Sequence, residues 1–241
     1  MSRFVLITRH PADCGELQAL LDGSDIKLRP YPVLRLEDVE DDRGLADAVA
    51  AVSPSDTPAW LVFASPRAPE RFARACRRGG AEHLLDLPIA VVGSGTARAV
   101  AKAGLESCLV GPGTGFGLAD KMIEELAPGA PVVFACGRDR RPELPARLAA
   151  AGHPVLPVVV YRMEATPPRE LPPLGPSLEA VVLTSPRAAS LYLEGVGGRP
   201  LPCPHLALGP TTRDAAAALG IDCRAPAEPT LESLAEELCT I

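Results

Sequence analysis

The stretch LVFASPRAPERF, from Leu61 to Phe72, decides the fold of this chain, because it returns about 120 residues later as VVLTSPRAASLYL, from Val181 to Leu193. Two further segments are also written twice: IAVVGSGTARAVAKAG (from Ile89) with HLALGPTTRDAAAALG (from His205), and, more loosely, VLITRHPADCGELQALL (from Val5) with VFACGRDRRPELPARLAAAG (from Val133). Repeats of this length are far longer than solenoid units, so they predict two homologous half-domains, or lobes. A cleft between two lobes is a common place for a ligand.

The pattern within each lobe predicts a parallel α/β fold. Short apolar runs alternate with Ala-, Leu- and charge-rich stretches of about ten residues, as in folds that alternate strands with helices. Near-continuous apolar strands indicate that helices cover both faces of each sheet. The expected strands are Phe4–Thr8, Ile26–Val33, Trp60–Ala64, Ile89–Val92, Ser107–Val110, Pro131–Ala135, Val155–Tyr161, Ala180–Thr184, His205–Leu208 and Asp222–Ala225.

Several helix starts and two irregular segments can be placed as well. Ser65-Pro66 and Ser185-Pro186 predict an N-cap serine followed by proline at the first helical position. The proline-rich Thr166–Pro176 predicts an extended linker. The acidic run Glu37–Arg43 predicts a solvated loop or a helix start.

The repeats leave two ways to divide the chain. A tandem division falls near Pro128. A crossed division places Leu36–Val160 in one lobe and combines Met1–Tyr31 with Ala180–Ile241 in the other. Both use the same repeated units, so periodicity alone does not choose between them.

Composition excludes several classes of protein. The net charge of −6 argues against a nucleic-acid partner, and the absence of an apolar run of about 18 residues argues against a membrane span. The start MSRFVLITRH has no signal-peptide pattern, which predicts a cytoplasmic protein. The seven cysteines form no C-x-x-C pair and are expected to be reduced and partly buried. The four histidines are scattered, so no metal site is expected.

Polar motifs recur where predicted strands end and helices begin. Ligands of open α/β sheets bind outside the carboxyl ends of the strands, and helix N-termini favour anions. Arginines in these motifs add charge-assisted hydrogen bonds to carboxylates or phosphates, so a ligand with many negative charges is expected. The motifs are Thr8-Arg9-His10, Ser65-Pro66-Arg67, Gly93-Ser94-Gly95-Thr96, Gly137-Arg138, Ser185-Pro186-Arg187 and Gly209-Pro210-Thr211-Thr212.

Other interpretations of these motifs stay open at this point. Each motif by itself is ordinary helix capping, and only the repetition favours ligand binding. GSGTARA resembles a dinucleotide fingerprint, but Arg98 stands at its third glycine and an acidic ribose partner is missing. No nucleophile can be nominated from spacing, so an enzyme would rely on positioning and electrostatics. Tyr161, at the end of an apolar run, could donate a proton to a leaving group or simply end a strand in water.

Taken in order along the whole chain, these units resemble the uroporphyrinogen-III synthase family. The matching segments are strand–Thr8-Arg9, Phe63-Ala64-Ser65-Pro66, Val92-Gly93-Ser94-Gly95-Thr96-Ala97, Val160-Tyr161, Leu183-Thr184-Ser185-Pro186 and Leu208-Gly209-Pro210-Thr211-Thr212. Three positions depart from the family pattern: Ala64 stands where threonine is frequent, His10 separates Arg9 from Pro11, and Arg213 follows the threonine pair.

The resemblance implies the crossed division and a reaction. Residues 1–33 with 164–241 would form one α/β lobe and residues 36–158 the other, with a two-strand connector near 30–36 and 158–163. The family cyclises hydroxymethylbilane, a linear tetrapyrrole with eight carboxylates, to uroporphyrinogen III by inverting ring D and releasing water. It is a lyase without a cofactor, and we expect a monomer. The alternative is a non-catalytic two-lobed protein of the same fold that binds a tetrapyrrole or another polyanion.

The resemblance also assigns roles to residues. Tyr161 is the expected proton donor for the departing hydroxyl. The expected substrate-binding residues are Arg9, Ser65, Thr96, Arg138, Ser185, Thr211 and Thr212.

Overall fold

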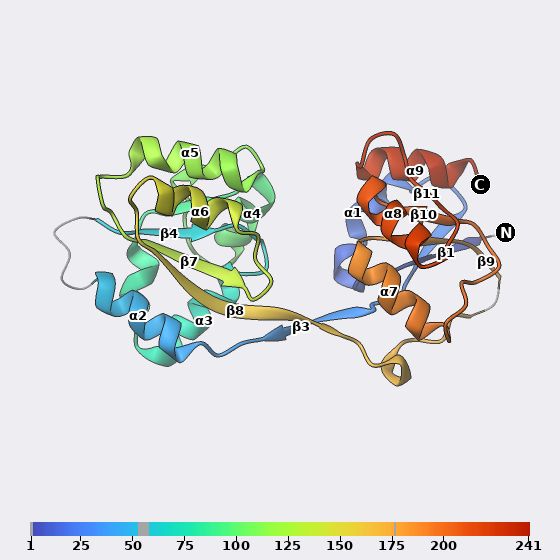
Figure 1. Cartoon of the computed structure of the whole chain (residues 1–241), viewed down its shortest axis with the longest axis horizontal. Coiled ribbons are helices and arrows are strands. Elements are labelled where there is room, and N and C mark those ends of the chain that lie inside the picture. The colour runs from blue at the N-terminus through green and yellow to red at the C-terminus, as the bar shows by residue number, and fades with distance from the viewer. Residues whose placement is uncertain (1, 53–57, 176) are drawn as a thin grey trace. The chain divides into compact units, whose positions relative to one another are not determined.

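The chain forms two compact units in the computed structural model, which describes residues 2–52, 58–175 and 177–241. Unit 1 combines Met1–Arg35 with Glu164–Ile241, and unit 2 is Leu36–Met163. Figure 1 shows that each unit is a sheet with helices on both faces. The α/β fold with parallel sheets flanked by helices is therefore confirmed.

Unit 1 is built on a five-stranded sheet with the order β11-β10-β9-β1-β2. Its strands are β1 (Arg3–Ile7), β2 (Ile26–Pro30), β9 (Leu178–Leu183), β10 (His205–Ala207) and β11 (Cys223–Arg224). The helices α1 (Gly15–Leu20) and α9 (Leu231–Cys239) cover one face, and α7 (Pro186–Gly195) and α8 (Pro210–Ala218) cover the other. Two short 3₁₀ helices, η1 (Pro11–Asp13) and η3 (Pro168–Glu170), complete it.

Unit 2 is built on a six-stranded sheet with the order β3-β8-β7-β4-β5-β6. Its strands are β3 (Leu34–Asp38), β4 (Trp60–Phe63), β5 (Ile89–Val91), β6 (Leu109–Val110), β7 (Val132–Gly137) and β8 (Val155–Ala165). Its helices are α2 (Asp42–Val52), α3 (Pro69–Gly79), η2 (Glu82–Asp86), α4 (Ser94–Lys102), α5 (Gly115–Glu125) and α6 (Glu143–Ala150).

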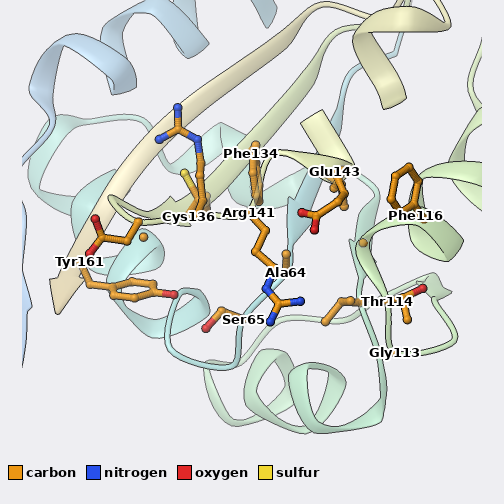
Figure 2. Close-up of a pocket in the computed structure, with 17 residues that line it drawn as sticks. Ala64, Ser65, Gly113, Thr114, Phe116, Phe134, Cys136, Arg141, Glu143 and Tyr161 are labelled. Atoms are coloured by element: carbon orange, nitrogen blue, oxygen red, sulfur yellow. The ribbon is translucent and has the colours of Figure 1, made fainter. Parts of the chain in front are cut away.

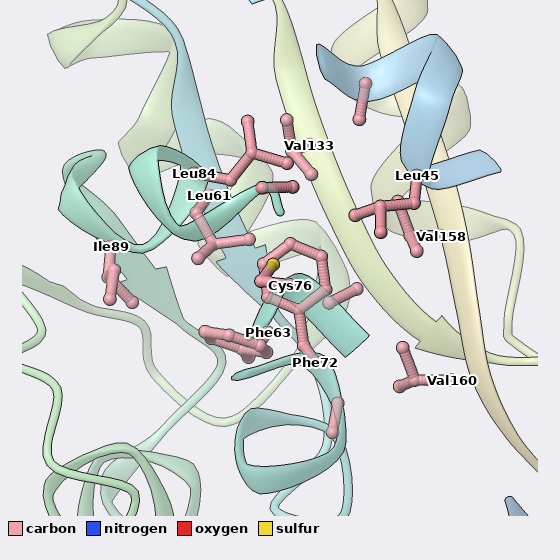
Figure 3. Close-up of a cluster of buried hydrophobic side chains, with 14 of the residues drawn as sticks. Leu45, Leu61, Phe63, Phe72, Cys76, Leu84, Ile89, Val133, Val158 and Val160 are labelled. Atoms are coloured by element: carbon pink, nitrogen blue, oxygen red, sulfur yellow. The ribbon is translucent and has the colours of Figure 1, made fainter. Parts of the chain in front are cut away.

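Two hydrophobic clusters hold the layers of unit 2 together. On one face α2, α3 and α4 pack on the sheet, with Phe63 and Phe72 edge to face at 6.0 Å between ring centroids (Figure 3). On the other face Leu118, Met122 and Leu144 bring α5 and α6 onto Phe134. Alternate residues of each strand supply the two clusters, because successive side chains of a strand point to opposite faces.

The repeated segments occupy the same places in the two sheets. The strand before Ser185, β9, lies between β1 and β10, and the strand before Ser65, β4, lies between β7 and β5. Matched in this way, β2-β1-β9-β10-β11 corresponds to β8-β7-β4-β5-β6, and unit 2 adds β3 at one edge. The internal repeat in the sequence is therefore a repeat of strand order.

The two Ser-Pro motifs start their helices differently. Ser185 caps α7 as predicted: its Oγ accepts the N–H of Ala188, and its carbonyl accepts the N–H of Ala189. The same prediction is wrong for Ser65, because α3 begins only at Pro69. Pro69 has no N–H to donate to the Ser65 carbonyl, so Ser65–Ala68 forms a separate turn closed by the Ala68 N–H, at 3.2 Å.

Three further segments differ from the sequence predictions. The apolar runs did not mark strand β3, since it contains only two leucines, although the resemblance implied a connector strand near 30–36. The acidic run Glu37–Arg43 contains a helix start as predicted, because α2 begins at Asp42, but its first two residues end β3. Strand β8 runs four residues beyond Tyr161, to Ala165.

The described part of the proline-rich segment Thr166–Pro176 is not a free linker. Thr166 Oγ1 donates to the Pro32 carbonyl at 2.6 Å, Arg29 donates to the Leu174 carbonyl at 2.6 Å, and Arg35 pairs with Glu170 at 2.7 Å. The segment also contains η3. Arg29 thus uses a backbone carbonyl of the segment, Thr166 donates from the segment to Pro32, and Arg35 binds the segment through the Glu170 side chain. Pro176 itself lies outside the described residues.

All seven cysteines are free thiols. Cys14, Cys76, Cys136 and Cys223 are buried, whereas Cys108 in unit 2 and Cys239 in unit 1 are exposed. Burial raises the pKa of the Cys76 thiol to about 12 and that of Cys223 to about 11. Within the described ranges, no helix has both the length and the apolar character needed to cross a bilayer.

Candidate active site

A cavity of about 620 Å³ opens at the carboxyl ends of the strands of unit 2. Ala64, which follows β4, and Ala135 of β7 form part of its wall. The starts of α5 and α6 form another part, and Tyr161 closes one side (Figure 2). The residues that line it are Ala64, Ser65, Val92, Gly113, Thr114, Gly115, Phe116, Phe134, Ala135, Cys136, Gly137, Asp139, Arg140, Arg141, Glu143, Leu144 and Tyr161. This is the sheet edge where open α/β folds bind ligands.

An irregularity in strand pairing aims Tyr161 at the cavity. Cys136 of β7 pairs with Val159 of β8, but Gly137 pairs with Tyr161, so Val160 is one residue extra. Regular alternation would send Val160 and Tyr161 to opposite faces, yet both pack against the cluster around Phe63 and Phe72. A bulge of this kind bends a strand and redirects a side chain. Tyr161 is half-buried, and its ring lines the cavity with the hydroxyl pointing inward (Figure 2).

Gly137 is the residue that lets the Tyr161 ring lie where it does. A Cβ at position 137 would be 2.7 Å from Cε2 and from Cζ of Tyr161, closer than real Cβ contacts come. The next residue, Arg138, donates its N–H to the Tyr161 carbonyl at 2.9 Å. The ring therefore packs directly on the backbone of β7 and is anchored on both sides of the bulge.

A glycine-rich loop, Gly111–Gly117 (GPGTGFG), forms the second part of the wall. Thr114 is the N-cap of α5, and its Oγ1 accepts the N–H of Gly117 at 3.1 Å. The first N–H groups of a helix have no acceptor within the helix. Gly115 and Phe116 are the first two residues of α5 and both line the cavity, at the end of the helix where the dipole favours anions.

The start of α6 meets the start of α5 at Gly115. A Cβ at position 115 would lie 3.4 Å from Cβ of Leu144 and 3.9 Å from Cβ of Glu143, so glycine permits this close approach. Two helix N-termini thus converge on one cavity. Their combined partial positive charge favours carboxylates, phosphates or another anionic group.

Two arginines add full positive charges. Arg141 points into the cavity toward Ser65 and Thr114 (Figure 2), and Arg140 lines the cavity near Cys136. Burial raises the pKa of Cys136 to about 11, although the charge of Arg140 acts in the opposite direction. Cys136 therefore stays a neutral thiol near pH 7, and the cavity contains no thiolate nucleophile there.

The structure brings two of the predicted site residues of unit 2 together and leaves two apart. Ser65 and Tyr161 both line the cavity. Thr96, in the first turn of α4, is only 3% exposed and lies outside the cavity lining. Arg138 is exposed and also lies outside the lining, and its contribution here is the backbone bond to Tyr161.

The other predicted residues belong to unit 1 and follow its strands. Arg9 comes after β1, Ser185 caps α7, and Thr211 and Thr212 lie in the first turn of α8. Thr211 is exposed, whereas Thr212 is 6% exposed. They stand at the carboxyl ends of the strands of unit 1, as the unit 2 residues do in their own sheet.

Sequence reasoning missed the glycine-rich loop, Arg141 and Glu143. The loop carried a usable signal, because GPGTGFG follows a short strand and opens a helix as the other motifs do. Arg141 was hidden in the run Arg138–Arg141, where Gly137-Arg138 was chosen by analogy with Thr8-Arg9. Across residues 2–52, 58–175 and 177–241, no group of three or more His, Cys, Asp or Glu side chains is arranged to hold a metal ion.

These features define a class of protein: a two-unit α/β protein with matching parallel sheets and a cavity at strand ends where two helices begin. Solved structures of this class are similar over the whole chain. Uroporphyrinogen-III synthetase from Helicobacter pylori matches with a TM-score of 0.66 at 14% identity, covering 100% of this chain and 99% of that one. A methionine-substituted uroporphyrinogen III synthase from the extremely thermophilic bacterium Thermus thermophilus matches with a TM-score of 0.56 at 21% identity, covering 98% and 97%.

The family follows from the sequence. The profile of the family described as uroporphyrinogen-III synthase HemD matches residues 15–236. No curated protein sequence matches the chain. Because the profile covers nearly the whole length, the chain belongs to the uroporphyrinogen-III synthase family, and the resemblance drawn from its motifs is confirmed.

Proposed function

We propose that this chain is a lyase that cyclises hydroxymethylbilane to uroporphyrinogen III with inversion of ring D. The hydroxyl of the terminal hydroxymethyl group leaves as water and an azafulvene forms. The substituted carbon of ring D attacks it, and a spiro intermediate rearranges to the type III macrocycle. No atom other than those of water is lost.

The observation that carries this proposal is the position of the Tyr161 hydroxyl in a cavity that also holds Arg141 and the starts of two helices. Hydroxide is a poor leaving group, and a phenol within reach can protonate it as it departs. The substrate is a flexible polyanion, so arginines and helix N-termini are suitable groups to bind it. Tyr161 would thus supply the proton, and the rest of the wall would fix the conformation.

We assign the remaining predicted residues to substrate binding. Ser65 and the starts of α5 and α6 would bind carboxylates in unit 2, with Thr96 and Arg138 in support. Arg9, Ser185, Thr211 and Thr212 would bind carboxylates in unit 1. The end-of-strand position that they share with the cavity residues supports this assignment.

The lobes of the enzyme would be residues 1–33 with 164–241, and residues 36–158, connected by strands near 30–36 and 158–163. The division of the chain into two compact units supports these boundaries. We also propose that the protein acts in the cytoplasm as a monomer. Its seven free thiols are compatible with a reducing compartment. Sedimentation velocity would test the monomer, since a dimer would sediment faster.

Product analysis tests the main proposal. The protein is added to freshly generated hydroxymethylbilane, the products are oxidised, and the type I and type III uroporphyrins are separated by chromatography. Predominant type III, compared with an enzyme-free control, is expected. Type I alone at the spontaneous rate would refute the enzyme, and tight binding of uroporphyrin in that case would establish the non-catalytic tetrapyrrole binder instead.

A further inference from the structure

Two side chains of opposite charge line the unit 2 cavity without neutralising each other. Glu143 is the first residue of α6 and Arg141 stands two residues before it, yet no ion pair joins them. Among the described residues, Oε2 of Glu143 is the buried side-chain polar atom that has no hydrogen-bond partner. Arg141 likewise has neither a hydrogen bond nor an ion pair with another described side chain. This contrasts with Arg147 on the same helix, which pairs with Asp120 at 2.8 Å.

The Glu143 carboxylate lacks hydrogen-bond donors, because one of its oxygens is buried without a partner. A carboxylate normally spreads its hydrogen bonds over both oxygens, and covering one without a partner costs free energy. The other oxygen must then take the available donors. Glu143 lies in the first turn of α6, where the helix dipole interacts favourably with a negative group. An unsatisfied carboxylate does not help the protein to fold, and residues of this kind are expected at functional sites.

The pair suits a ligand that carries both an N–H donor and an anion. A phosphate or a simple carboxylate satisfies Arg141 but is repelled by Glu143. A cation satisfies Glu143 but is repelled by Arg141. A pyrrole ring with carboxylate side chains satisfies both, since its N–H lies on one edge and its acid substituents lie on the opposite edge.

We propose that Glu143 and Arg141 form a two-point site for one pyrrole ring of the substrate, in which Glu143 accepts the ring N–H and Arg141 pairs with a carboxylate of the same ring. This inference rests on the proposed function. Two contacts on opposite edges prevent the ring from rotating about its methylene bridges. The choice between type I and type III closure depends on such rotations, so Glu143 becomes a determinant of the product isomer.

Ligand fragments provide a test that does not depend on turnover. The probes are a monopyrrole with one acetate and one propionate side chain, and its N-methyl derivative, with binding followed by NMR titration. Wild type is expected to bind the N–H pyrrole about 10-fold more tightly than the N-methyl pyrrole, as for a hydrogen bond to a charged group. Glu143→Gln should lose this preference, and Arg141→Gln should weaken both probes. Equal affinity of wild type for the two pyrroles, or no binding of either, would overturn the proposal.

Activity and stability give a second, independent readout. Glu143→Gln is expected to raise KM about 10-fold and to lower the fraction of type III product, while Tm stays the same or rises by about 2–4 °C as the covered charge is removed. Glu125→Gln, an exposed change at the end of α5, is the matched control and should alter neither. A lower Tm with an unchanged isomer ratio would mean that Glu143 is purely structural. If wild type itself makes only type I, the proposed function fails first, so the two failures are distinguishable.

Discussion

The carboxyl ends of the two sheets are built from the same strand order but end differently. In unit 1, Thr8 and Thr184 interlock: the Thr184 N–H donates to Thr8 Oγ1 at 3.0 Å, and Thr184 Oγ1 donates to the Thr8 carbonyl at 3.0 Å. In unit 2, Ala64 follows β4 as Thr184 follows β9, and Ala135 pairs with Phe63 on the neighbouring strand. Both alanines line the cavity. Hydroxyls hold the strand ends together in one unit, and methyl groups leave a wall for a ligand in the other.

This difference teaches how a duplicated fold can separate stability from chemistry. The Thr8–Thr184 pair of unit 1 satisfies its hydroxyl groups within the protein. The end of unit 2 leaves Tyr161, Arg141 and helix N–H groups directed at the cavity. Substitutions in the wall of the unit 2 cavity should therefore change activity more than stability, and substitutions of buried hydrogen-bonded hydroxyls in unit 1 should do the reverse.

The largest expected effect is a loss of kcat when Tyr161 of unit 2 is changed, compared with the same change at Tyr192 of unit 1. Tyr161→Phe should lower kcat by about 10²–10⁴-fold, the usual contribution of a general acid, with an unchanged unfolding transition. Steady-state kinetics with hydroxymethylbilane measures it.

Tyr192→Phe is the matched control in unit 1. It removes the hydroxyl that contacts His205 Nε2 at 2.8 Å and accepts the Leu201 N–H at 3.1 Å. It should lower the free energy of unfolding by about 1–3 kcal/mol and leave kcat nearly unchanged. Equal losses of kcat in both variants would refute the division of roles.

The next effect concerns the support of the Tyr161 ring. Gly137→Ala places a methyl group 2.7 Å from ring atoms of Tyr161. Because displacing a reacting group by about 1 Å can cost about 10²-fold in rate, kcat should fall by about that factor while circular dichroism stays native. Gly15→Ala in α1, where a Cβ meets nothing within 4 Å, is the control and should not slow the reaction. Full activity of the Gly137 variant would show that the ring position is not critical.

A smaller effect concerns the threonine pair of unit 1. Thr184→Val leaves Thr8 Oγ1 and its carbonyl without the Thr184 hydroxyl, so the free energy of unfolding should fall by about 1–3 kcal/mol in urea denaturation. Thr240→Val removes an exposed hydroxyl near the C-terminus and should change it by less than about 0.5 kcal/mol. If the two variants were equally stable, the interlocking bonds would have no net value.

The smallest effect is a pH dependence located in unit 1. Burial lowers the pKa of His205 below its usual value of 6.5. The unfolded chain therefore binds this proton more readily than the native protein, and stability falls as the pH decreases below about 6.5 toward the lowered native pKa. Urea midpoints between pH 5 and 8 should show this slope, and His205→Gln should flatten it. An identical slope in the variant would assign the dependence to other groups.

The sequence predicted the fold well because local signals agreed with global ones. Apolar runs, glycine stops and two repeated motifs marked most strands. The prediction of the start of α3 failed because Pro69 has no N–H to donate to the Ser65 carbonyl. The apolar pattern also failed at the edge strand β3, which carries few apolar residues. Ser65 could be found from its strand-end position, and Tyr161 from the resemblance of Val160-Tyr161 to the family, although β8 continues beyond it. Arg141 and Glu143 could not be found from the sequence, because the sequence does not show that these two neighbouring charges form no ion pair.

The distribution of thiols has a spectroscopic consequence. Thiol reagents attack the thiolate, so buried cysteines with raised pKa values react slowly near pH 7. The exposed Cys108 and Cys239 should be modified first, and they lie one in each unit. The natural sequence therefore provides two attachment points for nitroxide spin labels without any substitution. Double electron–electron resonance between the labels would measure how the distance between the two units changes when a tetrapyrrole binds.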